Sequence, residues 1–225
     1  MKYIIMQPWG IGDILYITPL IKALNEQNEV IWPVRKEFLW IKDYIDLNFI
    51  EYYNGIYDNY PLYTQIPTMY TDELMKREGN FNYIMSSKYE YFGYDSSNWL
   101  QLKWKRNISK ELKLAEDLGV DIKNDTYIIV NKHCGFPPHT ANYINPLTDN
   151  RIIYLELIDN YTLLDWGLLL ENAKEIHTVN TSILMVLGIL NPNIPIHVYP
   201  YVGHKDLTII DDILNYFPKW NKYSL

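Results

Sequence analysis

The first 34 residues change from a strand-like to a helix-like spacing of apolar positions and back again. Residues 2–6 and 28–34 are short apolar runs. Between them, apolar side chains recur at helical spacing, at Ile14, Leu15, Ile17, Leu20, Ile21 and Leu24. A helix joining two such strands completes a β-α-β unit and makes the strands parallel. The turn that contains Gly10 and Gly12 predicts a ligand-sized loop between the first strand and the helix.

One residue of this helix is unusual. Pro19 lacks the amide that a helix interior needs, and its ring crowds the preceding turn. Two outcomes are open at this point: the helix kinks at Pro19, or Thr18 caps a new helical start with Pro19 in its first position.

The pattern continues to Gly119 with less regular elements. We expect a helix at 35–45, a third strand at 48–53, a short helix at 71–77, a fourth strand at 81–86 and a helix at 109–118. Residues 54–71 are rich in Tyr, Pro, Asn and Gly and predict a long loop. Gly119 is a typical helix C-terminal signal.

After Gly119 the alternation of strands and helices begins again. Strands are expected at 126–131, 151–157, 175–179 and 195–199, and helices at 163–173, 181–190 and 207–217. Residues 133–150 contain three prolines and no helical period where a β-α unit would continue, so the second half is expected to be reduced. The sequence therefore predicts an α/β protein of two domains, 1–120 and 121–225, whose parallel sheets face a cleft.

Composition narrows the class of protein. With 48% hydrophobic and 21% charged residues, the chain is typical of an ordered globular protein. Its net charge of −7 argues against nonspecific coating of duplex nucleic acid, and the cations at 103–113 are most simply a solvated helix face. Cys134 is the single cysteine, which suits a reducing compartment. No apolar run approaches ~18 residues, so we expect a cytoplasmic protein without a membrane span.

The glycine turn is a poor dinucleotide fingerprint. In the pattern GxGxxG the third small residue lets the helix approach the strand, but Leu15 occupies that position. The second strand is followed by Arg35 and Lys36 instead of an acidic residue. These cations suit a 2′-phosphate, so an NADP-binding oxidoreductase remains an alternative.

Two further polar positions have both a structural and a functional interpretation. Asp13 is placed to cap its helix, but a carboxylate held ionised by the helix dipole is also a suitable general base. Asn180, Thr181 and Ser182 open a later helix, as plain caps do, and the amides of such a turn also bind phosphate.

Together, these two segments resemble glycosyltransferase family 9, the lipopolysaccharide heptosyltransferases and their relatives. The family opens with a strand, a GxGD turn and a helix with a Thr-Pro pair, as in residues 10–13 and 18–19 here. Its second domain has a strand that ends in an Asp-Thr/Ser-Gly turn, and residues 180–182 fall on that turn. The clear resemblance covers 2–34 and 163–190.

The resemblance implies a GT-B architecture of two Rossmann-like domains, with the acceptor side first and the nucleotide-sugar side second. It implies inverting, metal-independent transfer from a nucleotide sugar, with no cofactor and no catalytic metal. Asp13 corresponds to the catalytic base, and Gly10 and Gly12 to the acceptor-side loop. The donor-binding residues would be Lys132, Glu156, Asn180, Thr181 and Ser182.

Departures from the family keep a second interpretation open. Asn180 and Ser182 replace the Asp and Gly of the family's turn, and Met185 replaces a common His. The chain is also shorter than typical members, so a non-catalytic protein that binds a nucleotide or a glycan is the alternative. The acceptor is not specified: a glycan, a lipid-linked glycan or a modified nucleic-acid base all fit, the last suiting the viral or phage origin that an AT-rich composition allows. For the enzyme, we expect Asp13→Ala to abolish turnover with little change in melting.

Overall fold

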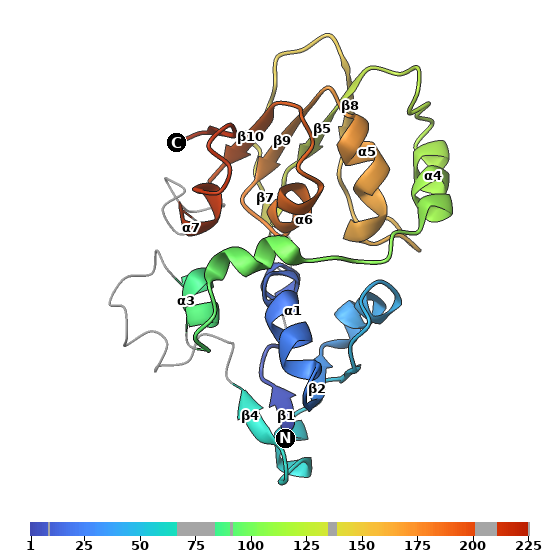
Figure 1. The fold of residues 1–225 in the computed structure, drawn as a ribbon. Helices are drawn as coiled ribbons and strands as arrows, with labels where there is room; N and C mark the ends of the chain where they lie inside the picture. Colours follow the sequence, from blue (N-terminus) through green and yellow to red (C-terminus); the bar gives the residue numbers. More distant parts are fainter. Residues whose placement is uncertain (9, 67–83, 91, 135–138, 201–210, 225) are drawn as a thin grey trace. The chain divides into compact units, whose positions relative to one another are not determined.

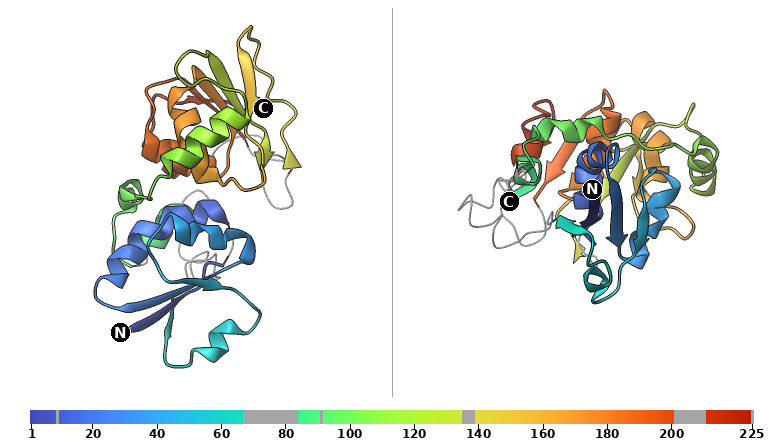
Figure 2. Two further views of the ribbon diagram at one scale, coloured as in Figure 1. Left: turned by 90° about the vertical axis from the view of Figure 1, so that its right-hand side faces the viewer. Right: turned by 60° about the horizontal axis from the view of Figure 1, so that its bottom comes forward.

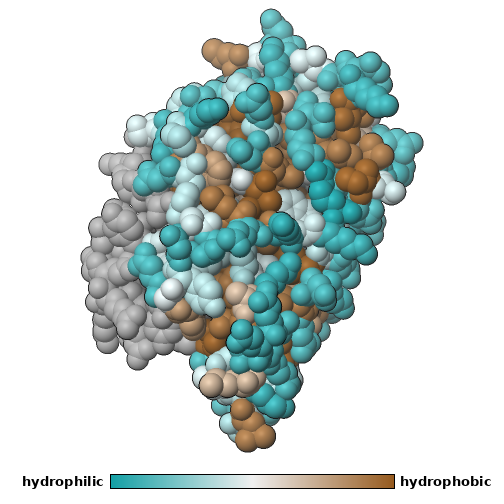
Figure 3. All heavy atoms as spheres, viewed as in Figure 1, coloured by the Kyte–Doolittle hydropathy of each residue, from teal (hydrophilic) through white to brown (hydrophobic). Residues whose placement is uncertain are grey.

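The computed structural model describes residues 1–8, 10–66, 84–90, 92–134, 139–200 and 211–224. The chain divides into two compact units, Met1–Lys105 and Arg106–Leu225 (Figure 1). Each unit contains a parallel β-sheet with helices, which confirms the predicted α/β class with two parallel sheets. Within the described residues, no helix is long and apolar enough to cross a membrane. Hydrophilic side chains cover much of the face shown in Figure 3, with apolar patches between them.

The first unit is built on a four-stranded sheet in the order β3-β2-β1-β4. Its strands are β1 (Lys2–Ile5), β2 (Glu29–Val34), β3 (Phe49–Glu51) and β4 (Thr64–Ile66). Each adjacent pair is parallel. The predicted first β-α-β unit is therefore confirmed, and β1 lies inside the sheet with neighbours on both sides.

Helix α1 (Ile11–Asn25) is continuous through Pro19. The Thr18 hydroxyl donates to the Ile14 carbonyl at 2.8 Å, one turn back along the same helix. Thr18 thus bonds within the helix and does not cap a new start. The apolar face of α1 is buried, as the helical spacing predicted, and Ile14 and Leu15 are fully inaccessible.

Three predictions for the first unit need correction. Residues 36–43 form a 3-10 helix, η1 (Lys36–Asp43), inside the segment predicted as a helix. The predicted fourth strand at 81–86 is wrong over its described part, because α3 (Ile84–Glu90) is helical. The fourth strand is instead β4, inside the segment predicted as a loop. The expected helix at 71–77 lies outside the described residues.

The second unit contains a five-stranded parallel sheet in the order β11-β10-β9-β5-β8. Four of its strands match the predicted ones. The strands are β5 (Tyr127–Asn131), β8 (Arg151–Tyr154), β9 (Glu175–Val179), β10 (Ile196–Tyr199) and the unpredicted β11 (Asn221–Lys222). The helices are α4 (Ile108–Asp117), η5 (Leu163–Trp166), α5 (Gly167–Asn172), α6 (Ile183–Leu190) and α7 (Asp211–Leu214).

The two faces of this sheet are covered differently. On one face the Tyr127 hydroxyl donates to the Leu169 carbonyl of α5 at 3.0 Å. On the other face Ala141, Ile144 and the buried Cys134 pack against strand residues such as Val130. Figure 2 shows helices on one side of the strands and the segment after residue 138 on the other. Residues 133–150 contain the antiparallel pair β6 (His133–Cys134) and β7 (His139–Thr140). The described residues of this range contain no helix, as the lack of a helical period predicted.

The contact boundary between the units precedes α4, whereas the sequence placed the boundary at 120/121. Arg106 pairs with the carboxylate of Glu171 on α5 at 2.8 Å and with that of Glu111 on α4 at 2.5 Å. Glu111 is 1% exposed and also accepts from the Leu168 amide at 2.8 Å. These contacts tie α4 to the second unit. The assignment of the units to an acceptor side and a donor side stays a prediction.

Candidate functional site

The turn after β1 is the candidate site of the first unit. The sheet order 3-2-1-4 places β1 where the chain changes direction across the sheet. Ligands of open α/β sheets bind at the carboxyl ends of strands at such a switch point. Gly10 precedes α1, the element that follows β1, and Gly12 and Asp13 lie in the first turn of α1. The segment predicted as the acceptor-side loop is therefore the start of α1 and the residue before it.

Gly10 is required by both its conformation and its surroundings. It caps α1 with φ at 79°, a left-handed conformation that favours glycine. A Cβ on Gly10 would lie 2.5 Å from an Asp13 carboxylate oxygen. Asp13 is the third residue of α1, so the helix is capped by Gly10 and not by Asp13. Because Gly10 has no side chain, the Asp13 carboxylate can occupy this space.

Lys88 is the residue that meets Asp13 in this unit. Its ammonium forms an ion pair with an Asp13 carboxylate oxygen and lies 3.1 Å from the Gln7 side-chain oxygen. The Lys88 side chain is 1% exposed, and that of Asp13 is 20% exposed. Asp13 is thus paired with a buried cation, while part of its own side chain remains accessible.

Helix α3 presents Lys88 because an aromatic contact holds it on α1. The Tyr89 hydroxyl donates to the Tyr16 carbonyl at 2.6 Å, and the two rings meet edge to face at 5.3 Å. Tyr16 also stacks on Trp99. Sequence analysis missed Lys88, because a lysine in a segment predicted as a strand gave no sign that its charge would be buried beside Asp13.

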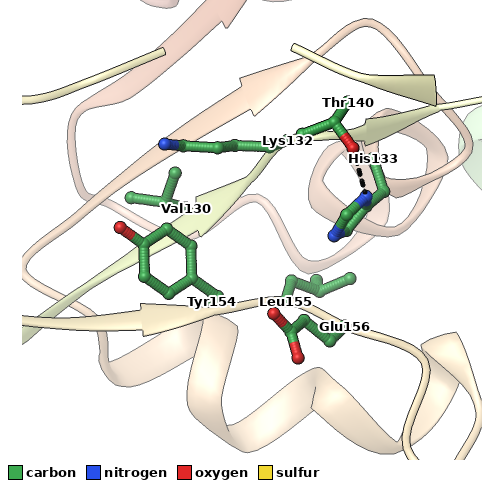
Figure 4. Close-up of a pocket in the computed structure, with 7 residues that line it drawn as sticks. All are labelled: Val130, Lys132, His133, Thr140, Tyr154, Leu155 and Glu156. Carbon is green, nitrogen blue, oxygen red and sulfur yellow. Dashed lines mark hydrogen bonds between the residues drawn. The ribbon is translucent and has the colours of Figure 1, made fainter. Parts of the chain in front are cut away.

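The candidate site of the second unit is a pocket at the carboxyl ends of β5 and β8. Its volume is about 220 Å³, and it brings together Lys132 and Glu156, which were both predicted to bind the donor. The lining residues are Val130, Lys132, His133, Thr140, Tyr154, Leu155 and Glu156 (Figure 4). A cation and a carboxylate from two different strand ends therefore share one concave surface.

The pocket side chains are partly held by one another. The Lys132 ammonium lies 5.3 Å from the centroid of the Tyr154 ring, within the range of a cation-π contact. His133 Nδ1 is 3.4 Å from the Thr140 hydroxyl. In Figure 4, His133 and Glu156 lie at one end of the pocket, and the Lys132 ammonium extends toward the other. Lys132 is half-buried and Glu156 is exposed, so both can meet a ligand.

Asn131 links this pocket to the turn at 180–182. Its side-chain amide donates to the hydroxyls of Thr178 and Thr181, at 3.0 and 3.1 Å. Its side-chain oxygen Oδ1 accepts from the His133 backbone amide at 3.3 Å. Asn131 is 2% exposed and connects the end of β5 to the residues before α6. The sequence analysis missed this buried asparagine because it reads as an ordinary strand end.

The three predicted turn residues have different surroundings. The Asn180 backbone amide donates to the Tyr199 carbonyl at 2.9 Å. This hydrogen bond continues the pairing of β9 with β10. Thr181 is held through Asn131. Ser182 caps α6 by position, but its side chain makes no capping hydrogen bond. The interpretation of Ser182 as a plain side-chain cap of α6 is therefore not supported.

Three of the five cations at 103–113 are paired with carboxylates, whereas Lys103 and Lys105 are exposed. Arg106 pairs with Glu111 and Glu171, and Lys110 lies 2.8 Å from the buried Asp165 carboxylate. Lys113 pairs with two acidic residues of its own helix. Arg106 and Lys110 therefore contribute to the packing of the second unit, because each pairs with a buried carboxylate.

Comparisons with known proteins give matches among solved structures. No protein-family model and no curated protein sequence matches the chain. A family 9 glycosyltransferase from Veillonella parvula matches with a TM-score of 0.49 and 9% identity, over 88% of this chain and 80% of the other. The E. coli heptosyltransferase WaaC with ADP matches with a TM-score of 0.42 and 11% identity, over 88% and 87%.

A third structure covers a smaller share of the other protein. The iron-containing dodecameric glycosyltransferase TibC from enterotoxigenic E. coli matches with a TM-score of 0.49 and 11% identity, over 91% of this chain and 61% of TibC. The matched structures thus include the family that the sequence motifs resemble. At 9–11% identity, the likeness is one of fold over most of this chain.

Proposed function

We propose that this protein is a glycosyltransferase that moves a sugar from a nucleotide-activated donor to an acceptor hydroxyl. The observation that carries the proposal is the meeting of Lys132 and Glu156 in one pocket at the carboxyl ends of β5 and β8. A nucleotide sugar offers a diphosphate and ribose hydroxyls. A cation binds the diphosphate, and a carboxylate accepts hydrogen bonds from the ribose hydroxyls.

The donor is proposed to occupy the second unit. A pocket of about 220 Å³ is smaller than the usual 300–1,000 Å³ of a whole-ligand site. It suits one portion of the donor, such as the ribose with Glu156 on its hydroxyls. Lys132 is then placed for the diphosphate, and the turn of Thr181 and Ser182 at the start of α6 is proposed to stabilise the charge that develops on the leaving group.

Asp13 is proposed as the general base. Its carboxylate takes the proton of the acceptor hydroxyl while that oxygen attacks the anomeric carbon. The bond between the anomeric carbon and the diphosphate oxygen breaks, and its electron pair leaves with the nucleoside diphosphate. Attack opposite to the leaving group inverts the anomeric centre and uses no catalytic metal. The exposure of Asp13 supports the role, because its side chain is 20% exposed and can meet an acceptor hydroxyl.

A non-catalytic nucleotide- or glycan-binding protein is the second candidate. The observation in its favour is that Asp13 already has a buried partner in Lys88, as a structural carboxylate would have. An NADP-binding oxidoreductase is less favoured, because one of its two proposed phosphate-binding cations, Arg35, pairs with Glu37 at 2.6 Å.

The test is transfer and hydrolysis of a panel of radiolabelled nucleotide sugars by wild type and variants. Asp13→Asn keeps the shape of the side chain and should lower turnover by about 10²–10⁴-fold, the usual contribution of a general base. Glu156→Gln should mainly raise the KM for the donor. Asp46→Asn, an exposed carboxylate of the first unit, is the matched control. Full activity of a folded Asp13→Asn protein would exclude Asp13 as the base.

A further inference from the structure

Two histidines and a glutamate gather on neighbouring strands of the second unit. Strands β9 and β10 are neighbours in the sheet (Figure 1). His177 of β9 and His197 of β10 are register partners in this parallel pair, which places their side chains side by side on one face. Glu175 precedes His177 by two residues and shares that face. One ligand atom of each residue lies within 4.8 Å of those of the other two.

Each imidazole uses one nitrogen and leaves the other without a hydrogen bond. His177 Nδ1 lies 3.0 Å from the Tyr199 hydroxyl, and His197 Nδ1 lies 2.9 Å from the Tyr223 hydroxyl. Both Nε2 atoms are buried and have no hydrogen-bond partner among the described residues. His177 as a whole is 6% exposed. Buried polar atoms are nearly always satisfied, so these two nitrogens need an explanation.

The Glu175 carboxylate faces both nitrogens at distances that suit a shared ion better than hydrogen bonds. Its oxygens lie 3.6 Å from His177 Nε2 and 3.7 Å from His197 Nε2, too long for hydrogen bonds. In a tetrahedral site with bonds of about 2.0–2.1 Å, neighbouring ligand atoms lie roughly 3.3 Å apart. We propose that Glu175, His177 and His197 bind a first-row divalent transition metal such as Zn²⁺.

The chemistry of the three residues agrees with this class of ion. Two imidazoles and one carboxylate suit Zn²⁺ and its neighbours, whereas Ca²⁺ and Mg²⁺ prefer oxygen ligands alone. Tyr199 and Tyr223 supply the outer hydrogen bonds that orient metal-binding imidazoles.

Metal binding requires one local adjustment. The two imidazole rings are now parallel, with centroids 4.3 Å apart and planes 3° apart. The lone pairs on Nε2 lie in the ring planes, so the rings must turn about their last torsion for both lone pairs to converge on one ion. The Glu175 side chain is 25% exposed, which leaves a side from which water can supply a fourth ligand.

The site would join β9 to β10 near the edge of the sheet. It uses different residues from the pocket formed by Lys132 and Glu156, and the inference does not rest on the proposed transferase activity. Its expected role is structural, because an ion that binds the folded arrangement stabilises it against unfolding.

The test uses the full chain, freed of metal by a chelator and then titrated with ZnCl₂ in a calorimeter. We expect one Zn²⁺ per chain and a higher melting temperature in its presence. Loss of an outer-shell partner alone weakens metal affinity by about 10-fold or more. His177→Gln and His197→Gln should each weaken binding by at least that much. His139→Gln, an exposed histidine on β7, is the matched control and should bind as wild type does.

A spectroscopic measurement on the wild-type chain keeps the test independent of how the variants fold. Co²⁺ in place of Zn²⁺ should give the strong visible bands of a tetrahedral site with nitrogen ligands, instead of the faint bands of the hydrated ion. The proposal is overturned by wild-type protein that binds no Zn²⁺. It is equally overturned by folded His177→Gln and His197→Gln proteins that bind Zn²⁺ as wild type does.

Discussion

Lys88 changes what a substitution at Asp13 should do to stability. Its side chain is 1% exposed, and its ammonium pairs with the Asp13 carboxylate. Breaking a buried ion pair by removing one partner typically costs about 3–5 kcal/mol, because the remaining charge is left uncompensated. The expectation that Asp13→Ala leaves the melting profile nearly intact is therefore revised: this substitution should lower the stability of the first unit.

The pair provides a double-mutant test of the role of Asp13. Asp13→Asn and Lys88→Gln should each destabilise the protein, and the double variant should be more stable than the sum of the two effects predicts. Chemical denaturation measures this coupling. If Asp13 is the base, the double variant regains stability but not transfer. Recovery of transfer together with stability would mean that Asp13 acts only as the partner of Lys88.

At the scale of single residues, the sequence identified the candidate site residues that belong to a recognisable turn. Gly10 and Asp13 were found because a glycine turn after a strand has few uses. Lys88 and Asn131 were missed, since their importance depends on burial beside residues 75 and 50 positions away, Asp13 and Thr181. No local pattern carries that information.

Among the elements, the contact of α4 with α5 depends on the absence of a side chain at Gly167. A Cβ there would lie 2.6 Å from a Glu111 carboxylate oxygen and 2.8 Å from an Arg106 nitrogen. Gly167→Ala must therefore displace a buried ion pair, although alanine favours helices. We expect a loss of roughly 1–3 kcal/mol, measured by urea denaturation. An unchanged midpoint for Gly167→Ala would contradict this packing.

The paired strands β9 and β10 should make stability depend on pH. Burial, the largest cause, lowers the pKa of both His177 and His197 below 6.5. The unfolded chain therefore binds more protons than the folded chain as the pH falls through about 6.5. The stabilisation from neutral histidines is present above that pH and is lost below it.

Denaturation midpoints between pH 7.5 and 5.5, measured with a chelator present, test this dependence. The wild-type free energy of unfolding should fall with pH more steeply than that of the His177→Gln/His197→Gln double variant. Parallel curves for the two proteins would show that other groups cause the decline.

Element prediction succeeded where periodicity was strong and failed where elements were short. The β-branched run at 126–131 and the amphipathic run after Gly10 gave β5 and α1 correctly. Strand β4 has only three residues and little apolar character, so pairing with β1 and not sequence defines it. Residues 81–86 carry an apolar cluster that suits either a strand or a buried helix, and the described part is helical.

For the whole molecule, the proposed donor site predicts stabilisation by a nucleoside diphosphate. A ligand that binds the folded state at 100 times its Kd adds about 2.7 kcal/mol. A melting screen with UDP, GDP, ADP and NADPH should therefore show a shift with one diphosphate, reduced in Lys132→Met. A shift with NADPH alone would favour an oxidoreductase, and no shift with any of the four would contradict the donor site.

Cys134 makes the second unit chemically addressable. It is the single thiol in 225 residues. It belongs to β6 and is buried at 3% exposure in the cluster formed with residues of β5 and β9. A thiol reagent can therefore react there only when this part of the unit opens. The rate of labelling then reports the opening of one unit separately from the other, without an introduced probe and without a background from other cysteines.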